Sequence, residues 1–291
     1  MSATAELPTR RNEAWKYSDL RAALSGADAP MVGDGAVIER LAAAAGRLET
    51  RTVTGAGEVF VDYLEGDGFE PSAEIATVAP GCAYHRIIVQ TGAGVPLSHC
   101  RVHLAEGATF RQFVVAQGAK LARIETVVEA QRKSTIELTG VYMADAGKHA
   151  DLTSTITMAG ADGVARQLIK GVARKGGRGV FQGKIVVERA AQKTDARQHH
   201  HGMLLEEGAE IFAKPELMIY ADDVQCAHGN TAGGLDESAL FYMRARGVPE
   251  AEARALLTEA FLAETLPDWA LPEVREEIED RIRTWLRKER R

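Results

Sequence analysis

The spacing of apolar and polar residues changes twice along the chain, and the first stretch has the period of a helix. Apolar residues recur there at roughly helical spacing, among them Ala14, Trp15, Leu20 and Leu24. Thr9 is a candidate N-cap and Gly26 a stop signal, so we expect a first helix between them. Residues 35–48 carry a second apolar stripe, which predicts an amphipathic helix.

From about Thr50 the apolar period falls to two, which is typical of β-strands. Val59, Val61 and Tyr63 alternate with their neighbours, and valine, isoleucine and threonine dominate the runs that follow. Strands are expected at residues 59–64, 86–90, 98–104, 109–115, 122–128, 134–138, 152–158, 183–188 and 216–220.

The turns between these predicted strands resemble one another. A glycine precedes a new strand in each, at Gly107, Gly118, Gly147 and Gly208. Glycine can adopt the positive φ that a tight corner needs. No long amphipathic helix separates the strands, which argues against a doubly wound α/β fold. The pattern therefore favours a mainly β solenoid over a sandwich or barrel.

The helical period returns near Asp236, which can cap a helix that contains Leu240 and Phe241. Gly247-Val248-Pro249 is typical of one helix ending and the next beginning, and a last helix is expected over about residues 272–288. The predicted division is an N-terminal helical segment (1–49), a β core (50–235) and a C-terminal helical domain (236–291).

Composition narrows the class of protein. The 291 residues are 45% hydrophobic and 26% charged, which suits a folded globular chain. The net charge of −6 offers no basic field for a phosphate backbone, so we expect no nucleic-acid partner. No apolar run is long enough to cross a membrane, no secretory signal is evident, and the three cysteines are scattered. We therefore expect a cytoplasmic protein that does not bind membranes.

Nucleotide-binding and hydrolase motifs are absent from the sequence. Gly147-Lys148 is followed by His149 and lacks the upstream glycine of a Walker loop, so we expect no ATP site. The short Gly55-Ala-Gly57 and Gly92-Ala-Gly94 runs are typical of turns. A β-helix enzyme would need a hexapeptide repeat or paired carboxylates facing a groove, and neither is visible. The sequence predicts no catalytic residues.

Three groups of residues could bind a metal ion. The cluster of Cys82, His85, His99, Cys100 and His103 resembles no paired CxxC site, and satisfied core residues are the favoured interpretation. In the triplet His199-His200-His201 only the outer two residues can share a face of a strand, and a solvated or partly packed strand end is the favoured interpretation. Cys226 and His228 are the sharper pair. If one strand runs on from Met218, Tyr220, Asp222, Val224, Cys226 and His228 all lie on one face. Thiol and imidazole would then start ~6.6 Å apart, close enough to share iron if a partner supplies further ligands.

Several motifs together resemble the SufB/SufD family. They are Gln192-Lys-Thr-Asp-Ala-Arg-Gln198, Met203-Leu-Leu205, Ala213-Lys-Pro-Glu-Leu217, Ile219-Tyr-Ala-Asp-Asp-Val-Gln-Cys-Ala-His-Gly229, Gly234-Leu-Asp236, Leu240-Phe-Tyr242, Arg246-Gly-Val-Pro249 and, near the start, Arg11-Asn-Glu-Ala-Trp-Lys-Tyr-Ser18. The resemblance is strong from about residue 183 to 257 and weak in the middle of the chain.

The resemblance implies a role in the SUF machinery for iron–sulfur cluster assembly. Family members are right-handed parallel β-helices with helical ends, and SufB and SufD pair with each other. Each is expected to bind a SufC-like ABC ATPase through its C-terminal helices, here through Phe241, Tyr242, Arg246 and Gly247. A transient cluster or iron ion would be shared with a SufB-like paralogue. The sequence leaves open a flavin and a homodimer of the isolated chain.

Two positions favour SufD over SufB. Ala209 stands where SufB has its sulfur-accepting cysteine, and Gly229 where SufB has a glutamate. His228 matches the interface histidine of SufD, and Cys226 the cysteine two residues before it. Gly202 and Asn230 depart from the SufD pattern, which has asparagine and alanine at these positions. We hypothesise a scaffold in which His228, with Cys226 as a secondary ligand, contacts iron; a pure assembly subunit without iron contact is the alternative.

Overall fold

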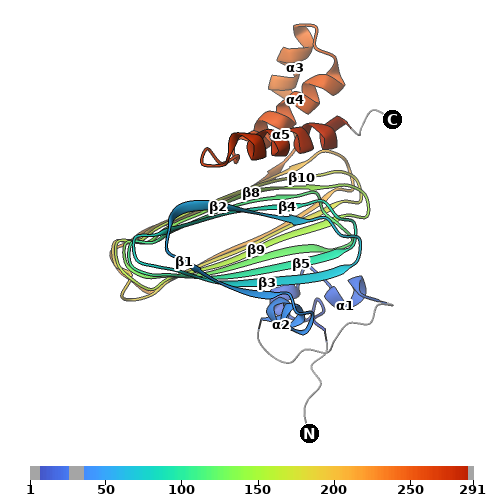
Figure 1. Cartoon of the computed structure of the whole chain (residues 1–291). Coiled ribbons are helices and arrows are strands. Elements are labelled where there is room, and N and C mark those ends of the chain that lie inside the picture. Colours follow the sequence, from blue (N-terminus) through green and yellow to red (C-terminus); the bar gives the residue numbers. More distant parts are fainter. Residues whose placement is uncertain (1–6, 26–35, 288–291) are drawn as a thin grey trace.

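Two stacked parallel sheets form the body of the protein. The computed structural model describes residues 7–25 and 36–287. Within them the chain coils as a solenoid, and each turn gives one strand to each of two seven-stranded sheets. Figure 1 shows the two sheets edge-on, one above the other, with the N-terminal helices below one sheet and the C-terminal helices above the other. The predicted mainly β solenoid with helices at both ends is confirmed.

The odd-numbered strands make sheet A and the even-numbered strands make sheet B. Sheet A contains β1 (Leu48–Val53), β3 (Phe69–Val78), β5 (Val95–Leu104), β7 (Ala122–Ala130), β9 (His149–Met158), β11 (Arg178–Val187) and β13 (Glu210–Ile219). Sheet B contains β2 (Ala56–Leu64), β4 (Ala83–Gln90), β6 (Thr109–Ala116), β8 (Thr135–Ala144), β10 (Val164–Ala173), β12 (Asp195–Leu204) and β14 (Gln225–Gly233).

The register holds equivalent residues of successive turns in columns. Phe110 of β6 pairs with Ile136 of β8, for example, and Ala165 of β10 pairs with Ala196 of β12. These four side chains point inward and belong to one buried apolar cluster. Because period-two alternation places every second residue inside, each turn adds a layer to the same core.

The N-terminal segment is less helical than its sequence suggests. Its described part holds a short 3-10 turn, η1 (Glu13–Trp15), and a single helical turn, α1 (Leu20–Ala23). Thr9 was predicted as the N-cap, but Asp19 caps α1 by accepting a hydrogen bond from the Ala22 amide. Thr9 instead closes a local turn with Asn12. The predicted stop at Gly26 lies outside the described residues.

The second predicted helix ends earlier than expected. The helix α2 spans Val37–Ala44, and Gly46 follows it with a φ of +69°. The Arg47 and Gly46 amides bond back to the carbonyls of Ala42 and Ala43, which is the Schellman end of a helix. The predicted helix over 35–48 is therefore wrong at its end, because Leu48 already begins strand β1.

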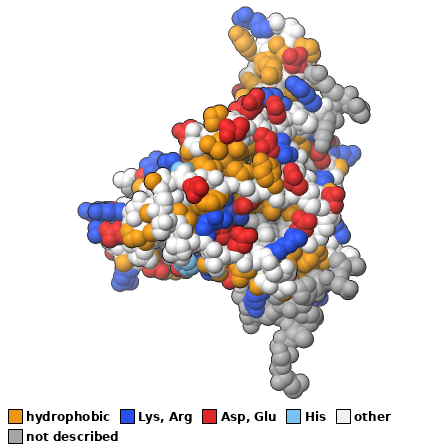
Figure 2. All heavy atoms as spheres, viewed as in Figure 1, with side chains coloured by type: hydrophobic (Ala, Val, Ile, Leu, Met, Phe, Trp, Pro, Cys, Tyr) orange, Lys and Arg blue, Asp and Glu red, His pale blue; other side chains and the backbone are white. Residues whose placement is uncertain are grey.

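Three helices follow the solenoid: α3 (Glu237–Ala245), α4 (Glu250–Ala263) and α5 (Pro272–Arg287). The last lies on the outside of sheet B, where Ile278, Ile282 and Trp285 join a buried cluster with Ile87 and Phe113. Figure 2 shows hydrophobic side chains gathered between these helices and the solenoid, bordered by acidic ones. None of the described helices combines the length and apolar character needed to cross a membrane.

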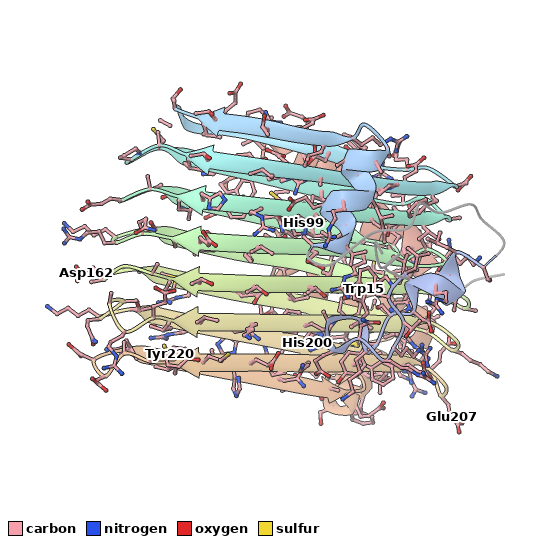
Figure 3. All side chains as sticks on the ribbon, turned by 90° about the horizontal axis from the view of Figure 1, so that it is seen from below. Trp15, His99, Asp162, His200, Glu207 and Tyr220 are labelled. Carbon is pink, nitrogen blue, oxygen red and sulfur yellow. The ribbon has the colours of Figure 1, made fainter. Side chains whose placement is uncertain are left out.

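The N-terminal segment packs on the outside of sheet A, over an ion pair that it helps to bury. Arg123 of β7 lies 2.9 Å from Asp151 of β9, and both side chains are almost completely buried. The Trp15 ring covers the guanidinium at 4.1 Å, and the Ser18 hydroxyl donates to Asp151 at 2.5 Å. Figure 3 shows Trp15 on the segment that crosses the strands from outside. Because leaving either charge buried and unpaired would cost free energy, the contact between Arg123 and Asp151 is expected to persist.

The same segment also reaches the last strand of sheet A. Tyr17 stacks on Phe212 of β13 with the ring centroids 5.3 Å apart, and Lys214 of β13 lies 2.5 Å from Glu13. The N-terminal residues that resemble the family signature therefore contact sheet A from β7 to β13.

Replacing Asp151 by alanine should destabilise the fold strongly. Among the described residues the change leaves buried Arg123 with Glu125 as its counter-charge, and a broken buried pair costs about 3 kcal/mol or more. Urea unfolding of Asp151→Ala and wild type would measure the difference in the free energy of unfolding.

Glu106→Ala is the matched control, because Glu106 pairs with Arg132 at 3.3 Å on the open surface, where both side chains are half exposed. An exposed pair contributes less than about 1 kcal/mol. Equal losses of stability in the two variants would contradict the docking described for the N-terminal segment.

Candidate functional site at the open end of the solenoid

The solenoid ends in two strands that have a neighbour on one side only. β13 pairs with β11 and β14 pairs with β12, and within the described chain no strand lies beyond either. Each last strand therefore presents a row of backbone N–H and C=O groups without sheet partners. Such an edge is a template for pairing with another chain unless it is covered. β14 is largely exposed along its length.

A corner separates the two strands. β13 ends at Ile219 and β14 begins at Gln225, so the single strand predicted from Met218 to His228 is wrong. Two hydrogen bonds fix the corner: the Asp223 amide donates to the side-chain oxygen of Gln192 at 2.9 Å, and the Lys193 amide donates to the Asp223 carbonyl at 2.6 Å. Figure 3 places Tyr220 at this corner and Glu207 at the opposite end of the last turn.

Cys226 and His228 nevertheless share a face, because both lie on β14 two residues apart. Cys226 pairs in register with Ala196 and His228 with Gln198, and both β12 residues are fully buried inside the solenoid. The two side chains thus belong to inward-facing columns that end at the last turn. Cys226 is half-buried against the core, while His228 is exposed because no further turn of the described chain covers it.

Burial governs the thiols of the chain. Desolvation raises the pKa of Cys226, and it raises the pKa of the fully buried Cys100 to about 11. A raised pKa leaves less thiolate at neutral pH, and the thiolate is the form that ligates metals. Cys226 would therefore need a bound cation to lose its proton near pH 7.

A buried histidine lies directly beneath the last turn, and the sequence did not predict it. His200 was expected at a solvated or partly packed strand end, but its side chain is fully buried. Its Nε2 lies 2.9 Å from the Tyr142 hydroxyl, and its Nδ1 lies 2.7 Å from Oδ1 of Asn230 on β14. Phe181 stacks on the ring at 5.0 Å, and Figure 3 shows His200 among the last turns. No local signal reveals this group, because His200 and Asn230 lie 30 residues apart and meet through the register of β12 and β14.

The other two histidines of the triplet lie on the outer face, as their alternation predicts. The rings of His199 and His201 stack with centroids 6.2 Å apart, and His201 bonds Thr231 at 2.7 Å. Over the ranges 7–25 and 36–287, no group of three or more histidine, cysteine, aspartate or glutamate residues is placed to hold a metal ion. A metal at His228 would thus need ligands from outside this chain.

Serine, histidine and aspartate meet at one buried point, but the arrangement differs from a nucleophilic triad. The Ser18 hydroxyl contacts Asp151 and also lies 3.1 Å from His149 Nε2. In a triad the carboxylate orients the histidine, whereas here it accepts from the serine. Ser18 is fully buried, so the group attaches the N-terminal segment to sheet A.

The predicted docking residues lie on the helix pair that projects from sheet B. Asp236 caps α3 as predicted, since its carboxylate accepts from the amides of Ser238 and Ala239. Phe241 is 72% exposed and Tyr242 is 59% exposed, although large apolar side chains are usually covered. Arg246 lies over the Tyr242 ring at 5.0 Å, and Gly247 ends the helix with a φ of +88°.

Comparison with known proteins identifies relatives of this architecture. The family described as SUF system FeS cluster assembly, SufBD core domain, matches residues 77–261. The iron–sulfur cluster assembly protein SufD of Escherichia coli is 34% identical over 174 residues, which are 58% of this chain and 41% of that protein. An iron–sulfur cluster assembly SufBD family protein of Synechocystis is 36% identical over 166 residues, 56% of this chain and 37% of that protein. The chain spans about two-fifths of the length of these relatives.

Thiol alkylation should rank the cysteines by burial and pKa. In the folded chain iodoacetamide should leave Cys100 unmodified at pH 7–8 and modify half-buried Cys226 slowly, with a rate that still rises above pH 9 because its pKa is raised. Mass spectrometry of timed samples, with urea-unfolded chain as the control, measures both rates. Equal modification of Cys100 and Cys226 in the folded chain would contradict this placement.

Proposed function

This chain belongs to the SUF system FeS cluster assembly family with the SufBD core domain, and we propose that it is a scaffold subunit of an iron–sulfur cluster assembly complex. The observation that carries the proposal is the open last turn, where Cys226 and His228 face the end of the solenoid between two unpaired strand edges. Iron–sulfur cluster assembly is the role that the names of its relatives state.

The partner proposed for this end is a SufB-like paralogue. A second solenoid of the same width could continue both sheets by pairing with β13 and β14, which would satisfy the edge N–H and C=O groups. Exposed apolar side chains at the nearby corner, Met218, Ile219 and Tyr220, would be covered in the same contact. Isolated chains could use the same edges to form a homodimer.

His228 is proposed to ligate iron or to bond a cluster sulfur across this join. Imidazole nitrogen is a suitable ligand for iron, and the exposed ring at the last turn can reach a second subunit. Cys226 is the secondary ligand, because its thiol is half-buried and its pKa is raised. Since the described residues of this chain offer two such ligands here, the partner would complete the shell.

The role of sulfur acceptor is assigned to the partner. Ala209, in the loop before β13, stands where SufB has its accepting cysteine, and it cannot act as a nucleophile. The present chain would then hold iron or the growing cluster while the partner supplies sulfur.

A SufC-like ATPase is proposed to dock on α3 and α4. Phe241, Tyr242 and Leu256 are exposed there and would supply an apolar contact surface, and Arg246 beside Tyr242 would add a cation. Because α4 continues into the part of the chain that packs on sheet B, movement of the ATPase could be transmitted to the solenoid.

A second candidate function is a pure assembly subunit that transmits this movement without touching iron. The observation that favours it is the lack of three metal-binding residues in one place in the described part of the chain. Iron titration of the purified complex with Cys226 and His228 both replaced separates the two functions, because a pure assembly subunit would leave the iron stoichiometry unchanged.

His228→Ala should leave complex formation intact and lower the yield of cluster about tenfold or more, because a ligand is lost while both strand edges remain. The yield is measured by absorbance and by iron and sulfide content after reconstitution. His103→Ala is the control, since His103 is an exposed histidine that bonds Glu129 at 3.1 Å on sheet A. Wild-type yield in His228→Ala would remove the proposed ligand role.

Phe241→Asp should weaken ATPase binding at least about tenfold, which is ~1.4 kcal/mol, because it places a charge in an apolar contact. Calorimetry with the purified ATPase measures the affinity. Leu271→Asp changes an apolar residue of 44% exposure before α5 and should bind as wild type does. Equal affinity of all three proteins would contradict docking at α3.

A further inference from the structure

Tyr142, His200 and Asn230 form a hydrogen-bonded file that runs from inside the solenoid to its open end. Tyr142 comes from β8, His200 from β12 and Asn230 from β14, so the file crosses several turns. The first two side chains are fully buried, whereas Asn230 is exposed at the last turn. Neither Tyr142 nor Asn230 is one of the two predicted metal ligands, Cys226 and His228.

The sequence makes room for this file with glycines. A Cβ at Gly171 or Gly179 would come within about 2 Å of the Tyr142 ring, at 1.9 Å and 2.0 Å. A Cβ at Gly202 would lie 2.9 Å from Ile211 and 3.4 Å from the His200 ring. Side chains at these three positions would displace the tyrosine or crowd the histidine, so the file depends on local backbone composition.

The protonation of the file follows from its burial. Burial lowers the pKa of His200 to about 4, so the ring is neutral near pH 7 and carries one N–H. Burial also raises the pKa of Tyr142, which keeps the hydroxyl proton. The tyrosine therefore donates to Nε2, and the imidazole donates from Nδ1 to the Asn230 carbonyl oxygen.

This arrangement decides which end of the Asn230 amide points outward. Its oxygen is taken by His200, so its nitrogen, with two N–H donors, is left toward the open end. In the described structure that nitrogen has no hydrogen-bond acceptor. His228 lies two residues away on the same face of β14, so the two side chains start ~6.6 Å apart.

We propose that Asn230 is a further binding residue of this end, whose amide N–H groups donate to an anionic sulfur, sulfide or thiolate, bound to iron at His228. Tyr142 and His200 are positioning residues, because they hold the amide without touching the sulfur. The proposal rests on the proposed iron site. A sulfur ligand of iron accepts N–H hydrogen bonds, and such bonds raise the reduction potential of a cluster.

The orientation of the amide can be measured without iron. Nitrogen-15 NMR of the histidine rings in the full chain should show His200 as the Nδ1–H tautomer between pH 6 and 8, with His200→Gln used to assign the signal. Asn230→Asp should keep this tautomer because a carboxylate also accepts from Nδ1. An Nε2–H tautomer in the wild-type protein would overturn the proposal, since the amide would then point its oxygen outward.

The effect on bound sulfur is measured as the reduction potential of the cluster in the assembled complex. Asn230→Ala removes the donors and should shift the potential to more negative values, and Asn230→Asp should shift it further because it also adds negative charge. Thr231→Val is the matched control: it removes a hydrogen bond to His201 from the neighbouring position on the outer face and should leave the potential unchanged.

The two proposals fail separately in this experiment. Unchanged potentials in both Asn230 variants, with cluster yield still dependent on His228, would overturn the role of Asn230 alone. An unchanged yield of cluster in His228→Ala would contradict the proposed iron site. The tautomer of His200 would still show whether the N–H donors of Asn230 face the open end.

Discussion

In-register backbone hydrogen bonding between successive turns is the constraint on which the rest of this structure depends. Each strand of the solenoid satisfies the N–H and C=O groups of the turn before it and receives the turn after it. β13 and β14 receive nothing in the described chain, so their outer edges remain open. The same register that builds the core therefore also places Cys226 and His228 at an exposed end.

The interior is not uniformly apolar, and the site continues one of its polar columns. Gln112 bonds Thr126 at 2.8 Å and Gln167 bonds Ser154 at 2.7 Å across the two sheets. In the next turn Gln198 donates to the Gly183 carbonyl at 3.1 Å, and His228 follows it in register. Because no strand of the described chain lies beyond His228, this column ends in an exposed side chain.

The sequence predicted the class of fold because period-two alternation and corner glycines are local signals. β5, β6 and β8 follow from their valine, isoleucine and threonine content. Of β12 the sequence predicted a strand end at the histidine triplet and not the whole strand, because its inward positions include Gln198 and His200, which interrupt the apolar pattern. Such polar positions are tolerated only because a partner from another turn satisfies them, and that partner cannot be read from a single strand.

The candidate site was likewise predictable where it depends on local spacing, and not where it depends on contacts between turns. Cys226 and His228 were placed on one face because they are two residues apart, and this holds although the corner after Ile219 breaks the longer strand assumed for them. The contact of His200 with Asn230 joins residues 30 positions apart, so it required the register of the turns. The early end of α2 depended on the positive φ of Gly46, which composition alone does not reveal.

Backbone hydrogen exchange of the chain, alone and mixed with the proposed SufB-like paralogue, measures directly whether the open end pairs with another solenoid. We expect amides at the outer edges of residues 210–219 and 225–233 to exchange fast in the free chain and to become protected on binding, while β5 and β7 remain protected in both states. Protection that appears elsewhere, with β13 and β14 unchanged, would contradict pairing at the open end.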